Sequence, residues 1–137
     1  MLLIAIYAGI FGILAVMLTL NVIRCRFKYK IGLGDGGHPS VQKAMRAHGN
    51  FIETVPLALL LIVYVQSVSF NLSLEILHGL CGGLLVSRLL HMWGMARSSG
   101  TTWQRFIGMI GTIAVIVSAS ALLIYTGVSE WESINNP

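Results

Sequence analysis

One short stretch of the chain places a basic, an amide and an acidic side chain where a helix would align them. Arg46, Asn50 and Glu53 are spaced by four and then three residues, so in a helix they fall within an arc of roughly 60°. Glu53 would lie about 10 Å further along the axis than Arg46. A stripe of this composition is suited to holding a polar ligand through charge-assisted hydrogen bonds.

Other basic residues stand near this stripe in the predicted bundle. Arg88 and His91 are three residues apart and share one helical face, Arg105 opens the last apolar stretch, and Arg24 closes the first. A charge inside a membrane span costs about 2.5–3.5 kcal/mol on insertion scales, so such residues usually face protein, water or a ligand. The four arginines outnumber the one membrane-embedded carboxylate, Glu53.

This imbalance has two interpretations. An excess of buried guanidinium groups favours an anionic ligand, ideally one with carboxylates that match the guanidinium fork. The alternative is a structural network in which Glu53 pairs with Arg88 and Asn50 ties helices together. The residues alone leave both open.

The elements that position these side chains are read from hydropathy. Hydrophobic residues make up 55% of the 137 residues and charged residues only 10%, whereas a soluble domain has nearer a quarter charged. Apolar stretches of about 20 residues are long enough to span a bilayer as helices. They lie at roughly 2–23, 46–66, 75–96 and 104–126. We therefore predict an all-α membrane protein, a four-transmembrane-helix bundle forming a single domain over 1–137.

The basic residues also predict orientation. All nine Lys and Arg fall on one side of the predicted membrane, around the first and third loops. Basic loops stay in the cytoplasm, so both termini are expected to be non-cytoplasmic and the loop at 32–39 cytoplasmic. The net charge of +4 follows this topology, so nucleic acid is not an expected partner, whereas anionic membrane lipids are.

The cysteines and glycines indicate less about function. The spacing of Cys25 and Cys81 suggests neither a metal site nor a disulfide. Small residues, including Gly79 and Gly83 in the third stretch and Gly108 and Gly111 in the fourth, would let helices approach closely, within or between subunits.

The stripe resembles the signature of a known family. The segment 46–53 reads Arg-Ala-His-Gly-Asn-Phe-Ile-Glu and is followed by Pro56. It resembles the RAHxNxxE motif of the MAPEG family, the membrane-associated proteins in eicosanoid and glutathione metabolism. The segment 22–26, the glycine-rich loop up to Gly37 and the Arg-Leu-Leu-His of 88–91 are also similar, especially to small bacterial inner-membrane members. The resemblance covers roughly 10–112.

The resemblance implies a four-helix bundle assembled as a homotrimer, with glutathione bound between adjacent subunits near the cytosolic face. Arg46 and Asn50 would hold the polar groups of the tripeptide, and Glu53 would meet its ammonium or orient an arginine. The remaining residues of the implied binding set are Arg24 and Arg88, for carboxylate contacts, and His91 from the Arg88 motif. Arg105 aligns with the family's fourth-helix arginine near the sulfur, where a cation lowers a thiol pKa.

The chain also departs from some members of the family. Phe106 stands where some eicosanoid-forming relatives have serine, Met95 and Met109 stand where such relatives have tyrosines, and Gly49 replaces a basic residue. The hydroxyl donors and one cation are therefore missing. Eicosanoid synthesis is not expected, and binding of glutathione is better supported than its turnover.

The leading interpretation is a glutathione transferase or peroxidase in a bacterial inner membrane. Its second substrate would be a lipophilic small molecule that enters from the bilayer, and Arg105 would stabilise the attacking thiolate. The alternative is a non-catalytic scaffold or lipid-binding protein on the same fold. A small multidrug transporter is a third reading, against which the arginine-rich cluster argues.

Overall fold

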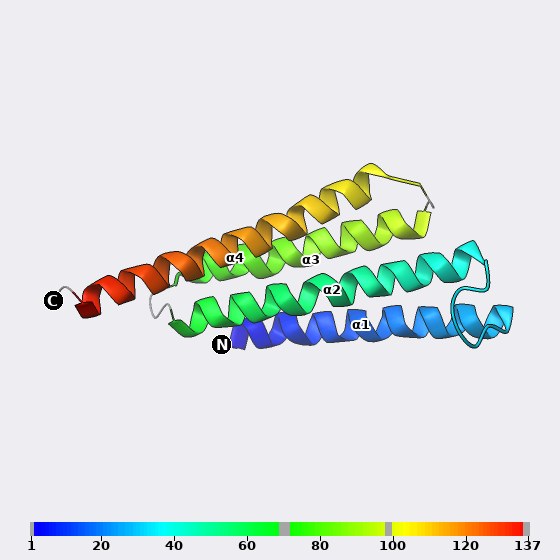
Figure 1. Cartoon of the computed structure of the whole chain (residues 1–137), viewed down its shortest axis with the longest axis horizontal. Helices are drawn as coiled ribbons and strands as arrows, with labels where there is room; N and C mark the ends of the chain where they lie inside the picture. Colours follow the sequence, from blue (N-terminus) through cyan, green and yellow to red (C-terminus); the bar gives the residue numbers. More distant parts are fainter. Residues whose placement is uncertain (1, 69–71, 98–99, 136–137) are drawn as a thin grey trace.

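The structure is a computed structural model that describes residues 2–68, 72–97 and 100–135. Its described residues form four helices and no strand. They are α1 (Leu2–Tyr29), α2 (Pro39–Val68), α3 (Leu74–Arg97) and α4 (Trp103–Asn135). The helices run alternately up and down, so that the two ends of the chain lie at the same end of the bundle (Figure 1). All four are long and apolar enough to cross a membrane, which confirms the predicted helical class.

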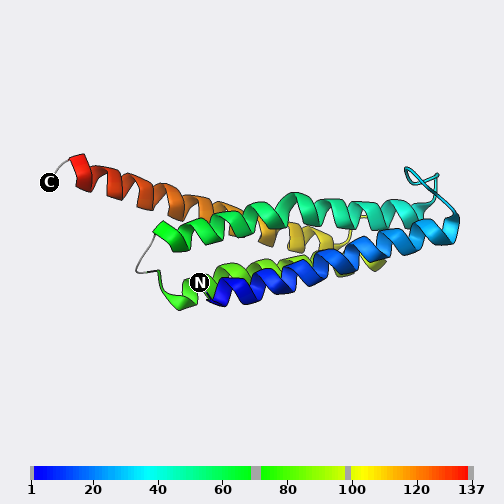
Figure 2. The ribbon, with the colours of Figure 1, turned by 90° about the horizontal axis from the view of Figure 1, so that it is seen from below.

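The helices are longer than the apolar stretches that predicted them. α1 continues to Tyr29 and ends where Lys30 takes a left-handed conformation (φ 54°). α2 begins at Pro39, a residue suited to the first turn of a helix. α4 runs on to Asn135 and extends beyond the other helices (Figure 2). Hydropathy marks only the part of a helix that matches the bilayer, whereas backbone hydrogen bonding continues into polar flanks.

The packing places α2 and α3 at the centre. These two helices contact each other, α1 packs against both, and α4 packs against both from the other side. In the described residues α1 and α4 do not meet. The central core contains Phe11 and Phe51, whose ring centroids lie 6.3 Å apart, together with the fully buried Ile62 and Leu84.

Glycines set the distance between α3 and α4. A Cβ added to Gly108 would lie 2.5 Å from the carbonyl oxygen of Ser87, and one added to Gly111 would collide with the Ser87 hydroxyl. A Cβ on Gly94 would lie 2.6 Å from Cγ of Arg105. Gly108 and Gly111 of α4 therefore let two helices of one chain approach closely. By contrast, Gly79 has no atom within 4 Å of an added Cβ.

We expect Gly108→Ala to destabilise the protein by roughly 1–3 kcal/mol, because the new methyl group must push α3 and α4 apart. Gly79→Ala is the matched control, since it adds the same methyl group to a membrane helix in open space. Equilibrium unfolding in mixed detergent micelles measures both variants. Equal stability of the two would show that the α3–α4 seam is not closely packed.

Candidate functional site

The largest fully buried side chain of the described residues is an arginine. Arg88 Nη2 donates to Asn50 Oδ1 at 2.7 Å, and Nη1 reaches the hydroxyl oxygens of Thr54 and Thr112 at 3.2 and 3.3 Å. Nη2 also lies 3.1 Å from Nδ1 of His91. We call these five residues the Arg88 cluster. It joins α2, α3 and α4 about 13 Å from the end of α3.

The threonines of the cluster are oriented by their own helices. Thr54 donates its hydroxyl hydrogen to the carbonyl of Asn50 at 2.8 Å, and Thr112 donates to the carbonyl of Gly108 at 2.8 Å. Each oxygen is thereby left as an acceptor for Arg88. Sequence reasoning missed both residues. Their positions could have indicated them, because Thr54 follows Asn50 by one helical turn and Thr112 follows Gly108 by one turn.

The charge of Arg88 is not neutralised within the described part of the chain. All four of its hydrogen-bonding partners are amide, hydroxyl or imidazole groups, and its buried Nε has no partner. The ring of Phe51 lies 5.9 Å from Cζ, a weak cation–π contact. A buried cation is normally paired with a carboxylate. The cluster thus provides hydrogen-bonding partners for both Nη atoms of the guanidinium but no counter-ion for its positive charge.

Glu53 does not provide the missing carboxylate. Its side chain is exposed on α2 and forms no ion pair with any described residue. The structural alternative, in which Glu53 pairs with Arg88, is therefore wrong for the single chain. The other half of that alternative holds, because Asn50 does tie α2 to α3 through Arg88.

The remaining predicted residues do not join the cluster. Arg46 is exposed on α2 and Arg24 is exposed on α1, and neither has a hydrogen-bonding partner among described residues. Arg105 is half-buried on α4, where its Nη1 donates to the carbonyl of Gly100 at 2.7 Å. The structure thus brings Asn50, Arg88 and His91 into direct contact.

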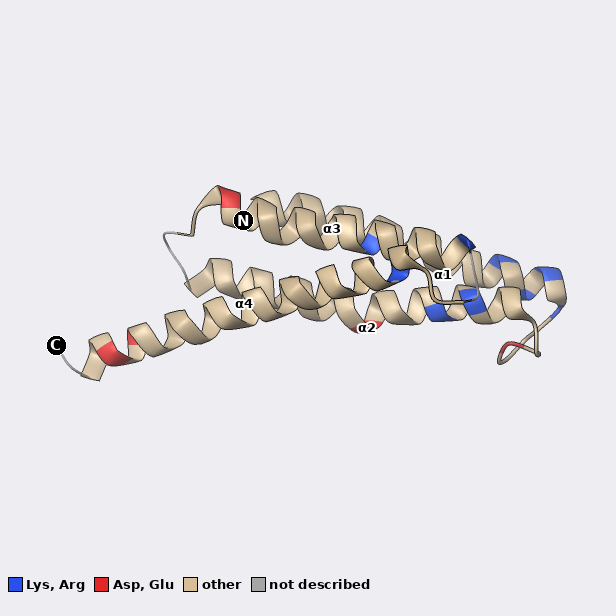
Figure 3. Cartoon of the chain, turned by 90° about the horizontal axis from the view of Figure 1, so that it is seen from above, with Lys and Arg blue, Asp and Glu red and all other residues tan. Residues whose placement is uncertain are grey.

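These basic residues share one end of the bundle. Figure 3 shows Lys and Arg gathered toward the end that contains the α1–α2 loop, whereas Asp and Glu lie mostly at the other end. We call this the basic end; its residues are Arg24, Arg26, Lys28, Lys30, Lys43, Arg46, Arg88, Arg97 and Arg105. Its excess positive charge is suited to binding anionic groups.

The positions that depart from eicosanoid-forming relatives differ in exposure. Phe106 is 62% exposed on α4, Met109 is half-buried one turn later, and Met95 is buried on α3. None of the three side chains can donate a hydrogen bond. At these three positions, therefore, a ligand would find no hydroxyl donor.

Comparison with known proteins identifies the family that the chain matches. The sequence model of the MAPEG family matches residues 4–125. The protein named Inner membrane protein YecN, from Escherichia coli strain K12, is 33% identical to the chain over 115 residues. That match covers 77% of this chain and 86% of the relative. The protein of the same name from E. coli O6:H1 is similar to the same extent.

Proposed function

Because this chain belongs to the MAPEG family, we propose that it is an integral inner-membrane protein that binds glutathione at its basic end. The further proposal is that the thiolate of the bound glutathione attacks lipophilic electrophiles, either as a transferase, which conjugates them, or as a peroxidase, which reduces them. The inner membrane is the location given in the name of the E. coli relative YecN. The orientation we propose puts the basic end in the cytoplasm and both termini outside, and reporter fusions to the C-terminus check it.

The observation that supports this proposal is the buried Arg88, whose charge has no carboxylate partner among the described residues. Glutathione has two carboxylates, an ammonium group and a thiol. A carboxylate near the Arg88 cluster would neutralise the guanidinium and form charge-assisted hydrogen bonds. Exposed Arg46 and Glu53 flank Asn50 on α2 and present a cation and an anion to the same zwitterionic ligand.

The proposed site needs more than one copy of the chain. Arg24 lies on α1 and Arg105 on α4, two helices that do not contact each other in the described residues. A ligand that touches both arginines is therefore most simply placed between adjacent subunits. This agrees with the homotrimer that the family resemblance implies, and the trimer remains part of the proposal.

The chemistry proposed is nucleophilic attack by sulfur. The thiol loses its proton to solvent, the thiolate forms a bond to the electrophilic carbon, and the leaving group departs with its electron pair. In a peroxidase reaction the thiolate would attack a peroxide oxygen, the O–O bond would break and the alcohol would leave. A second glutathione would then attack the sulfenic acid formed, to give glutathione disulfide and water. The guanidinium of Arg105 stabilises the thiolate before attack, since a nearby cation lowers a thiol pKa.

We expect Arg105→Leu to leave glutathione affinity nearly intact while it raises the pKa of the bound thiol and slows conjugation to a nitroaryl halide. The change removes the cation proposed to lie beside the sulfur but none of the groups proposed to hold the peptide. Ultraviolet absorbance of the bound thiolate across a pH titration measures the effect. Arg97→Leu, which removes another cation of the basic end, is the control, and an unchanged thiol pKa in Arg105→Leu would exclude Arg105 from the mechanism.

A second candidate function is favoured by one specific observation. Phe106, Met109 and Met95 supply no hydroxyl donor where relatives that form eicosanoids have them, which suits a scaffold or lipid-binding protein. The titration separates the two candidates. Absence of thiolate in the wild-type protein with glutathione bound would favour the scaffold.

A further inference from the structure

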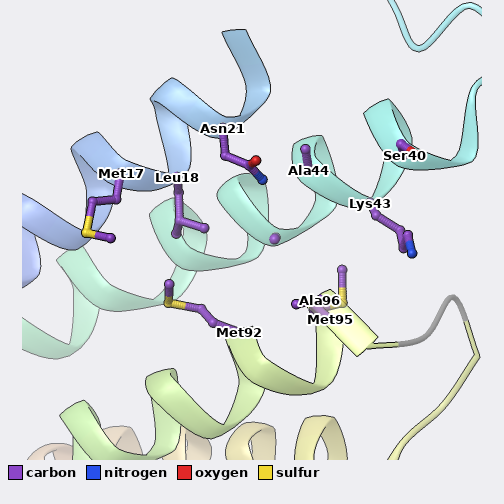
Figure 4. A pocket seen from close by; sticks show the side chains of 10 residues that line it. Met17, Leu18, Asn21, Ser40, Lys43, Ala44, Met92, Met95 and Ala96 are labelled. Carbon is purple, nitrogen blue, oxygen red and sulfur yellow. The ribbon is translucent and has the colours of Figure 1, made fainter. Parts of the chain in front are cut away.

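A cavity of the basic end lies on the other side of α3 from the α3–α4 seam. It has a volume of about 420 Å³ and is lined by residues of α1, α2 and α3 only (Figure 4). No residue of the Arg88 cluster and no residue of α4 lines it. The cavity is thus distinct from the site proposed for glutathione, and its size lies within the range of about 300–1,000 Å³ typical of small-molecule pockets.

The wall of this cavity is apolar and adaptable. Met17 and Leu18 of α1 face Met92 and Met95 of α3 across it (Figure 4). On α2 the lining residues Ala44 and Ala47 are buried and short, so they leave the space between the methionines open. Methionine side chains are flexible and polarizable and fit chains of varied shape. Such a wall is suited to a linear hydrocarbon chain.

The cavity also has a polar side. Asn21 of α1 and Ser40 and Lys43 of α2 line it at the end near the α1–α2 loop (Figure 4). Lys43 is half-buried, and within the residues that the structure describes it has neither a hydrogen bond nor an ion pair. The side chains of Asn21 and Ser40 are exposed and likewise form no hydrogen bond with a described residue. No acidic side chain lines the cavity, so its polar side is cationic.

We propose that this cavity binds an anionic amphipath with a single acyl chain. The acyl chain packs among Met17, Met92 and Met95, and the anionic head accepts hydrogen bonds from Lys43, Asn21 and Ser40. Two sources share this chemistry, a free fatty carboxylate and a phosphate-bearing lysolipid. The two proposals can fail separately, because none of the residues proposed to hold glutathione lines this cavity: Arg24, Arg46, Asn50, Glu53, Arg88, His91 and Arg105.

Photolabelling tests the proposal on the full-length protein in lipid nanodiscs. The probe is palmitate with a photoreactive diazirine in mid-chain, and mass spectrometry locates the label. We expect labels on the segments that contain Met17, Met92 and Met95. Unlabelled palmitate or lysophosphatidate should compete at least tenfold better than hexadecanol, which has the same chain without a charge. The stronger of the two anionic competitors identifies the source.

Two variants with matched controls complete the test. Lys43→Gln should weaken competition by palmitate roughly tenfold, about 1.4 kcal/mol, whereas Lys28→Gln removes a nearby cation outside the cavity and should change nothing. Ala96→Leu fills the cavity from its exposed rim and should reduce labelling, whereas Ala121→Leu on the exposed face of α4 should not. Equal competition by hexadecanol, unchanged binding in Lys43→Gln, or labels spread over the outer faces of α1 and α4 would each overturn the proposal.

Discussion

Arg88→Ala is expected to abolish glutathione binding and to destabilise the bundle by roughly 2–5 kcal/mol, the range for truncating a large buried side chain to alanine. The truncation leaves a cavity between α2, α3 and α4. It also removes the donor from the side-chain oxygens of Asn50, Thr54 and Thr112, of which Thr112 is fully buried. Equilibrium unfolding in mixed micelles measures the stability, and calorimetry measures the binding.

Arg88→Lys separates the two effects. Lysine keeps the positive charge but cannot reproduce the forked geometry that reaches Asn50 and both threonines at once. We expect a folded protein whose glutathione affinity is at least tenfold lower. Arg88→Ala with wild-type stability and wild-type affinity would show that the cluster is neither structural nor part of the site.

Asn50→Asp is expected to keep the fold and to lower glutathione affinity by about 2 kcal/mol or more. Aspartate is nearly the same shape as asparagine, and its carboxylate would stand where Oδ1 now accepts from Arg88 at 2.7 Å. The variant therefore gives Arg88 an internal counter-ion, and the attraction for the carboxylate of a ligand is lost. Calorimetric titration with glutathione gives the affinity, and circular dichroism confirms the helical content.

Gln42→Glu is the control for this charge effect. It makes the same amide-to-carboxylate change at an exposed position of α2 near the basic end, so it tests whether added negative charge alone weakens binding. If Asn50→Asp bound glutathione as tightly as the wild type, the unneutralised charge of Arg88 would not be what attracts the ligand.

The fold class followed directly from the lengths of the apolar stretches, since a bilayer fixes the length of a spanning helix. Hydropathy did not mark the end of the last helix, because residues up to Asn135 lie in a polar flank beyond the apolar stretch. The packing of α3 against α4 could not be predicted from the sequence either. Both helices contain pairs of closely spaced glycines, 79 and 83 in α3 and 108 and 111 in α4, and only the tertiary structure shows that Gly108 and Gly111 press against the neighbouring helix whereas Gly79 does not.

The candidate site was predictable where one helix determines it. Arg88 and His91 were expected on one face because they are three residues apart, and they do lie in contact. The pairing of Arg88 with Asn50 rather than Glu53 depends on the rotation of α2 against α3, which no spacing within α2 reveals. Thr54 and Thr112 were missed because a threonine in a membrane helix often bonds only to its own backbone, as both do here in addition to meeting Arg88.

The most direct test of the central proposal is calorimetric titration of the purified protein in nanodiscs with glutathione, beside the variant Arg46→Ala. Arg46 is exposed and has no partner among the described residues, so its removal should not change stability. We predict saturable binding by the wild type and an affinity loss of roughly 1.5–3 kcal/mol in the variant, the range for hydrogen bonds to charged groups. No saturable binding by the wild-type protein, or equal affinity in the two proteins, would contradict the assignment of this basic end as a glutathione site.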